Sequence, residues 1–349
     1  MLKSRTILPL YTPKSPGTYV DANTRALLWS KGRYAIKDGV ADMTVHQYQP
    51  RIYHSALGSF APVLRIVSGD TVVTTTVDAA GQDSSGTKVT SGPNPQTGPF
   101  YVEGAEPGDV LAVRFDRLWP NRRTGWSSSA LAPNVVDPSF VTEMPSRQKS
   151  PRAQWELDLE KGTGTLVEPE TRPRRLILPL RPMLGCFGVA PPNRQTISSD
   201  TSGTYGGNMD YRGFVQGVTV YFPVFSPGGL LFVGDGHAVQ GDGEITGTGV
   251  ETSFDVAFTA KLLKGKEIGW PRAENEEYIM TIGNARPLDQ ALQHATSEML
   301  RWLLKEFCLD TRLTHILLGQ CVEYDIGNVF DPAYTVVCRL SNRWIRLLK

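Results

Sequence analysis

The clearest indication of fold class comes from three consecutive segments, Val218-Thr-Val-Tyr-Phe-Pro-Val224, Ser226-Pro-Gly-Gly229 and Leu230-Leu-Phe-Val233. The first and third are short apolar runs rich in β-branched and aromatic residues, which favour strands. The second contains proline and adjacent glycines, which are typical of a tight turn. We therefore predict two strands joined by a turn, and the second strand leads directly into the glycine-rich segment Gly234–Glu244.

The same alternation of strand and turn continues on both sides of this unit. Upstream, the β-branched run Thr71–Val77 and the apolar run Val110–Phe115 each follow a glycine-containing turn, and downstream Gly249–Phe258 alternates with period two. The chain has 34 glycines and 25 prolines spread along its length, as frequent turns require. These patterns predict a mainly β fold (α+β class), with two β-rich lobes resembling a sandwich or barrel.

One long helix is expected in the C-terminal half. Pro287 suits the first helical turn, and apolar residues then recur at steps of three and four up to Phe307. His294 lies beside this apolar stripe, and we interpret it as structural.

We expect a single domain over residues 1–349, with two β-rich subdomains of about 1–180 and 181–349 as the alternative. The segment Trp119–Arg175 is rich in proline, serine, arginine and glutamate. It resembles an excursion of several loops more than a second core.

The charge balance argues against two classes of partner. The chain has 36 Lys+Arg and 35 Asp+Glu, a net charge of +1, so nothing favours nucleic acid or an anionic membrane. No apolar stretch is long enough for a transmembrane helix or a signal-peptide core, and a cytoplasmic location is expected. The four cysteines are widely spaced, which indicates neither a thiolate zinc site nor a disulfide framework.

The strongest local cluster of chemically active side chains lies in Gly234-Asp-Gly-His-Ala-Val-Gln-Gly-Asp-Gly-Glu244. Asp235, His237, Asp242 and Glu244 fall within ten residues, and the glycines let the backbone approach an ion or substrate closely. Imidazole and carboxylate groups suit Zn²⁺, Mn²⁺ or Fe²⁺. The alternative is an ordinary Gly/Asp turn between two strands.

Other polar residues lie at predicted strand ends or in loops. Asp78 ends the threonine-rich strand, Glu103 ends another strand, and Asn208 and Asp210 follow two glycines in Tyr205-Gly-Gly-Asn-Met-Asp210. Each of these is weak evidence on its own.

Together these segments resemble the acetamidase/formamidase family. The matching motifs occur in the order found in that family, between about Pro62 and Glu251: PVLRIVSGDTVVTTTVDA, NPQTGPFYVEGAEPGDVLAV, LGCFGVAP, YGGNMD and SPGGLLFVGDGHAVQGDGEITGTGVE. Asp325-Ile-Gly-Asn328 resembles a degenerate form of a late family strand.

The resemblance implies hydrolysis of a small amide, formamide-like or acetamide-like, to a carboxylic acid and ammonia. It also implies a mainly β fold, a divalent metal site and homo-oligomers (dimers or larger). We expect zinc, with Mn, Fe and Ca as alternatives. The family usually has a carboxylate three residues before Asp78, where this chain has Thr75.

Within this hypothesis the metal polarises the substrate carbonyl or activates a water molecule. The residues matching the family motifs are assigned as follows: metal ligands His237, Asp235, Asp78 and Asp210; catalytic residues Glu244, Asp242 and Glu103; substrate-binding residue Asn208.

Two other functions stay open. Cys186 lies inside the motif LGCFGVAP and could act as a nucleophile, although its apolar sequence neighbours favour a packing role. A non-catalytic β module that binds a metal such as Ca²⁺ or a carbohydrate is the third hypothesis, and His237 argues against a calcium site because Ca²⁺ prefers oxygen ligands.

Overall fold

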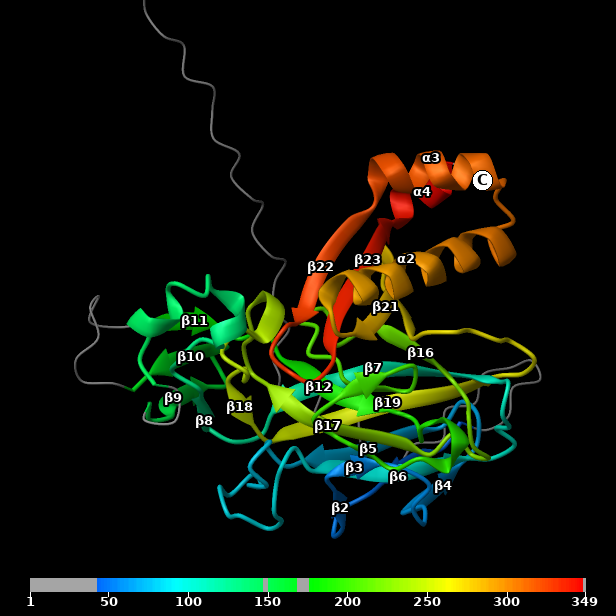
Figure 1. Cartoon of the computed structure of the whole chain (residues 1–349). Helices are drawn as coiled ribbons and strands as arrows, with labels where there is room; N and C mark the ends of the chain where they lie inside the picture. The colour runs from blue at the N-terminus through cyan, green and yellow to red at the C-terminus, as the bar shows by residue number, and fades with distance from the viewer. Residues whose placement is uncertain (1–42, 147–149, 168–175, 348–349) are drawn as a thin grey trace, which may run out of the picture. The chain divides into compact units, whose positions relative to one another are not determined.

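Two large β-sheets carry most of the chain in this computed structural model, which describes residues 43–146, 150–167 and 176–347 (Figure 1). The predicted mainly β class is confirmed. Both sheets take strands from either side of residue 180, the boundary suggested for two subdomains.

The first sheet has nine strands and is mostly antiparallel. Its strands, in spatial order, are β1 (Val45–Gln47), β5 (Thr71–Thr76), β19 (Phe254–Leu263), β7 (Val110–Pro120), β16 (Thr219–Pro223), β20 (Arg272–Glu274), β21 (Tyr278–Ala285), β23 (Tyr334–Ser341) and β22 (Glu323–Asn328).

The second sheet has twelve strands. Nine lie in the order β11 (Ile177–Pro179), β10 (Thr163–Leu166), β9 (Ala153–Asp158), β8 (Thr124–Ser127), β18 (Glu251–Thr252), β17 (Leu231–His237), β12 (Met183–Gly188), β15 (Gly206–Asn208) and β14 (Ser202–Gly203). Strand β6 (Gln96–Val102) also pairs with β17, and it carries β2 (Tyr53–His54) and β4 (Leu64–Ile66). A separate two-stranded sheet joins β3 (Ala56–Leu57) to β13 (Ile197–Ser198).

The long helix is present as α2 (Leu288–Lys305), which contacts β21 and β23 (Figure 1). Two shorter helices, α3 (Thr311–Cys321) and α4 (Asn342–Leu347), were not predicted. Helix α3 begins after Asp310, whose side chain accepts a hydrogen bond from the Leu313 N–H at 3.0 Å and so caps the helix. Within the described part of the chain, no helix is both long and apolar enough to cross a membrane.

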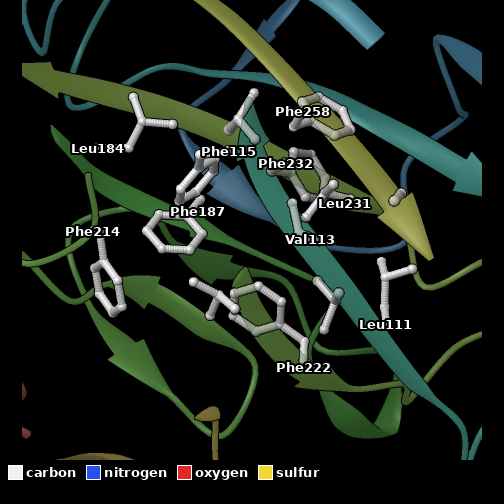
Figure 2. Packing of buried hydrophobic residues seen from close by; sticks show 14 of the residues in the cluster. Leu111, Val113, Phe115, Leu184, Phe187, Phe214, Phe222, Leu231, Phe232 and Phe258 are labelled. Carbon is white, nitrogen blue, oxygen red and sulfur yellow. The ribbon is translucent and has the colours of Figure 1, made fainter. Parts of the chain in front are cut away.

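The main hydrophobic core is built from side chains of both large sheets. Phe187 of β12 lies edge-to-face against Phe115 of β7 and Phe214, each at 4.9 Å between ring centroids, and against Phe222 of β16 at 5.7 Å (Figure 2). All four rings are fully buried. This packing fixes β12 against the first sheet, and β12 is the strand beneath the polar cluster described below.

The segment Trp119–Arg175 contains more regular structure than we expected. It supplies β8, β9 and β10, which extend the second sheet, and Trp155 and Leu157 form a small core with Ala238 and Val250. The interpretation as a loop excursion was therefore wrong for this part. Ala153, Trp155 and Leu157 alternate with exposed residues in β9, but this short pattern is surrounded by prolines and charges that obscured it.

We predict that Phe187→Ala destabilises the protein by about 3–5 kcal/mol, because it leaves a cavity among three aromatic rings. The matched control is Phe140→Ala, since Phe140 is 49% exposed and should change stability by less than about 0.5 kcal/mol. Urea unfolding followed by circular dichroism measures both. Equal losses in the two variants would contradict the assignment of Phe187 to the core.

Candidate functional site

Strand β17 runs through the first half of the glycine-rich segment and presents two site residues. Asp235 and His237 are two residues apart and therefore lie on the same face of the strand. Strand β18 pairs with β17 so that Glu251 lies opposite His237. The His237 Nε2 atom is 2.9 Å from Glu251 Oε1 and 3.3 Å from Asp235 Oδ1, and all three side chains are buried.

Gly185 of β12 forms the floor beneath these groups. A Cβ atom at this position would be 2.2 Å from Asp210 Oδ1, 2.7 Å from Asp235 Oδ2 and 3.1 Å from His237 Cε1. Only a residue without a side chain leaves room for these groups to converge. Asp210 itself follows β15 and is fully buried, with φ at 44°.

Glu244 and Asn328 complete the cluster from the other side. Glu244 lies in a short 3-10 turn (Asp242–Glu244) after β17 and is buried. The Asn328 Nδ2 of β22 donates to Asp210 Oδ2 at 2.6 Å, to Asp331 Oδ2 at 2.5 Å and more weakly to Glu244 Oε2 at 3.3 Å. Asn328 therefore ties three acidic side chains together.

Four carboxylates, those of Asp210, Asp235, Glu244 and Glu251, are buried around a single imidazole. In the described residues no Lys or Arg forms an ion pair with any of them; their one basic partner is His237. Ligand atoms form two close groups that share His237: Asp210–His237–Glu244 and Asp235–His237–Glu251, each with its atoms within 4.8 Å of one another.

Three buried atoms in this cluster have no hydrogen-bond partner within the described ranges of the chain: His237 Nε2, Asp210 Oδ1 and Glu251 Oε2. Unsatisfied buried polar atoms are costly, and these belong to residue types that ligate metals. A nitrogen donor together with carboxylate oxygens, crowded over a glycine, fits a divalent cation of the zinc type.

Burial and mutual repulsion perturb the acid–base behaviour of the cluster. Burial, reinforced by Asp235, raises the pKa of Asp210 well above its usual range, and burial together with Asp210 does the same to the pKa of Glu244. Burial raises the pKa of Glu251 to about 7. Burial by itself lowers the pKa of His237, but the carboxylates of Glu251 and Asp235 outweigh it and raise that pKa well above its ordinary value.

A set of amide side chains borders the acids. Asn94 Nδ2 donates to Asn208 Oδ1 at 2.7 Å and to Asp235 Oδ2 at 3.1 Å. Asn208 in turn donates to Asp331 at 2.6 Å. Asp331 is partly exposed, and burial raises its pKa to about 6. The NH₂ group of Asn208 has two hydrogens, and the hydrogen bond to Asp331 uses one of them.

The structure does not bring three of the predicted residues into the cluster. Asp78 is buried, but its carboxylate accepts from the Arg122 guanidinium at 2.7 Å, from Trp126 Nε1 at 3.1 Å and from two backbone N–H groups. Asp242 is exposed and paired with Arg212. Glu103 is 43% exposed and pairs with Arg65 at 2.6 Å.

Asp78 therefore has a complete set of partners without a metal. The expectation that these three residues act as ligand or catalyst rested on their positions in family motifs, and sequence position did not show which way each side chain points.

Several residues of the cluster were missed by sequence reasoning: Asn94, Gln240, Glu251, Asn328 and Asp331. Glu251 closes the longest family-like motif, and its neighbours alternate with period two, so its position was visible but not its role. Asn328 and Asp331 come from the degenerate late strand and the turn after it.

Cys186 lies against the acidic cluster, and no described residue acts as an activating base for it. Its Sγ is fully buried and donates to the Ser199 carbonyl at 3.4 Å. Burial, followed by the nearby Asp235 and Asp210, raises the pKa of the Cys186 thiol well above its usual range. These surroundings disfavour the thiolate that a cysteine nucleophile needs.

Comparisons with known proteins identify relatives of this chain. The family model described as Acetamidase/Formamidase family matches residues 188–295. The solved acetamidase of Yersinia enterocolitica shares 32% identity and a TM-score of 0.73, over 87% of this chain and 93% of that one. The acetamidase structure from Bacillus halodurans shares 29% identity and a TM-score of 0.73, over 86% and 99% of the two chains.

Among curated proteins, the acetamidase of Mycolicibacterium smegmatis is 30% identical over 48% of this chain and 53% of its own length. The chain spans about half the length of the curated relatives it matches. The likeness to the Yersinia structure covers nearly all of that protein, and the matched family model includes β17 and Glu251. The chain therefore belongs to the acetamidase/formamidase family.

Proposed function

We propose that this protein hydrolyses a short linear amide, such as formamide or acetamide, to a carboxylic acid and ammonia with the help of a divalent metal ion. The single observation that carries the proposal is the convergence of four buried carboxylates on His237, with no Lys or Arg partner among the residues that the structure describes. Such a concentration of negative charge needs a cation or protons to be stable. Membership of a family whose relatives are named acetamidases and formamidases supports the substrate class.

We propose His237, Asp235 and Glu251 as the ligand set. The His237 Nε2 lies within 3.3 Å of one oxygen from each of the two carboxylates, so these atoms already surround a common point. Zinc suits one imidazole and two carboxylates, and Mn²⁺ or Fe²⁺ would also accept them. The nitrogen donor makes Ca²⁺ the least suitable of the metals considered.

A cation held there would polarise the amide carbonyl and lower the pKa of a water molecule. The protein's own contribution is proton transfer and positioning. Glu244 is the proposed proton carrier, because it is buried beside His237 and because burial and Asp210 raise its pKa well above its usual range. It would take the proton of the attacking water and deliver it to the leaving nitrogen.

Asp210 and Asn328 would hold Glu244 in place, since Asn328 donates to both acids. The partly exposed Asp331 and Gln240 lie where the cluster approaches the surface, which is the side from which a small amide would enter. Assembly into homo-oligomers and a cytoplasmic location remain part of the proposal.

His237→Ala should reduce bound metal from about one ion per chain to near zero and lower amide hydrolysis at least ~100-fold, because the only nitrogen ligand is lost. Metal content is measured by plasma mass spectrometry, and activity by ammonia release from formamide and acetamide. His315→Ala is the control, since His315 is exposed on α3. A metal-free wild type with full activity would end the proposal.

Glu244→Gln should keep metal binding and lower kcat by roughly 10²–10⁴, with a much smaller change in KM, because an amide cannot carry the proton. Asp242→Asn, in the same turn but exposed, should stay within about threefold of wild type. A larger loss of kcat in Asp242→Asn than in Glu244→Gln would contradict the assignment of proton transfer to Glu244.

Gly185→Ala should weaken metal binding more than about tenfold, because its methyl group would overlap Asp210 Oδ1 and Asp235 Oδ2 and displace them. Gly241→Ala is the control from the glycine-rich segment, because a Cβ there meets nothing within 4 Å. Chelator competition measures the affinity of both variants. Equal affinities would show that Gly185 does not shape the site.

A further inference from the structure

We infer that Gln240 is a positioning residue that holds His237 with its Nδ1–H on the Gln240 carbonyl and its Nε2 toward Asp235 and Glu251. The inference rests on the proposed metal-dependent function and names a residue that the ligand set leaves out. Gln240 lies three residues after His237, in the loop that leaves β17, and is partly exposed.

The orientation of the Gln240 amide follows from its backbone neighbours. Its Nε2 contacts the carbonyl oxygens of Asp210 and Gly327, the latter at 3.5 Å. Backbone carbonyls only accept hydrogen bonds, so the NH₂ group must be the end that faces them. The Gln240 Oε1 is consequently the end that faces the imidazole.

The orientation of the glutamine then determines the hydrogen on the histidine. Gln240 Oε1 lies 2.7 Å from His237 Nδ1. An amide oxygen has no hydrogen to give, so Nδ1 must carry the proton and donate it. In the neutral ring this leaves the lone pair on Nε2, which is the atom 2.9 Å from Glu251 and 3.3 Å from Asp235.

Packing prevents the ring from reversing this arrangement. A Cβ at Gly249 would be 2.6 Å from His237 Cγ and 2.7 Å from Nδ1, so the ring lies directly on the Gly249 backbone. His237 is 1% exposed. A ring so closely packed keeps the orientation that its Nδ1 partner selects, and that partner is Gln240.

Gln240 also joins the three segments that make the site. It contacts His237 at the end of β17, the carbonyl of Asp210 after β15, and the carbonyl of Gly327 in β22. Gln240 therefore has two separate effects. Its side-chain carbonyl determines the orientation of the His237 ring, and its NH₂ group links two backbone segments. The experiment must distinguish the first effect from the second.

The test compares zinc affinity, by competition with a chromophoric chelator, in wild type, Gln240→Leu, Gln240→Glu and the control Gln293→Leu. Gln293 is exposed on α2. Gln240→Leu removes the acceptor and should bind zinc about 10–100-fold more weakly, as expected for loss of a group that orients a ligand. Gln240→Glu keeps an acceptor but loses the NH₂ group, and should stay within about threefold of wild type.

Gln240→Leu with wild-type affinity would overturn the inference, and so would equal weakening of Gln240→Leu and Gln240→Glu, which would indicate a backbone link alone. A crystal structure of zinc-loaded wild type gives an independent result: zinc on Nε2 supports the inference, and zinc on Nδ1 overturns it whether or not the variants fold. If wild type binds no metal at all, the proposed function fails first, and the two failures are thereby distinguished.

Discussion

Burial of several like charges around one imidazole is the constraint on which this structure depends. Asp210, Asp235, Glu244 and Glu251 are all buried beside His237. Without a counter-charge, each added carboxylate makes the others harder to ionise. The amides of Asn94 and Asn328 donate hydrogen bonds to these acids and offset part of this cost.

The pairing of strands in the second sheet determines which site residues lie beside one another. Strand register places His237 opposite both Met183 of β12 and Glu251 of β18, and it places Cys186 opposite Asn208 of β15. A shift of one residue in any of these pairs would turn a site residue to the other face of the sheet. The aromatic packing around Phe187 fixes β12, so the hydrophobic core and the polar site depend on the same strand.

Much of this could be predicted from the sequence, because local patterns encode local structure. Strand and turn alternation gave the fold class, and the period of apolar residues after Pro287 gave α2. Composition did not reveal that β17 continues through Gly234–His237, since glycine and aspartate disfavour strands and only tertiary pairing holds them there. The helix α3 was missed because it has only 11 residues, too few for a long repeat of apolar positions.

For the site, the sequence identified Asp210, Asp235, His237 and Glu244 but also selected Asp78, Asp242 and Glu103. The difference lies in partners that are remote in sequence. Asp78 is neutralised by Arg122, 44 residues later, and Glu103 by Arg65, 38 residues earlier. Only the pairing of Glu251 with His237 across β17 and β18 distinguishes Glu251 from an ordinary strand residue, and sequence patterns do not contain that pairing.

Completion of the site depends on a late part of the chain, because Asn328 at the end of β22 and Asp331 just after it belong to the polar cluster. Asn328 and Asp331 are about 80 residues beyond Glu251 in sequence, yet Asn328 donates a hydrogen bond to Asp210 and Asp331 accepts one from Asn208. During synthesis from the N-terminus, the acids from β15 to β18 leave the ribosome well before these partners do. The polar centre is thus completed among the last steps of co-translational folding, and a chain released early would carry its buried acids without the amide that joins them.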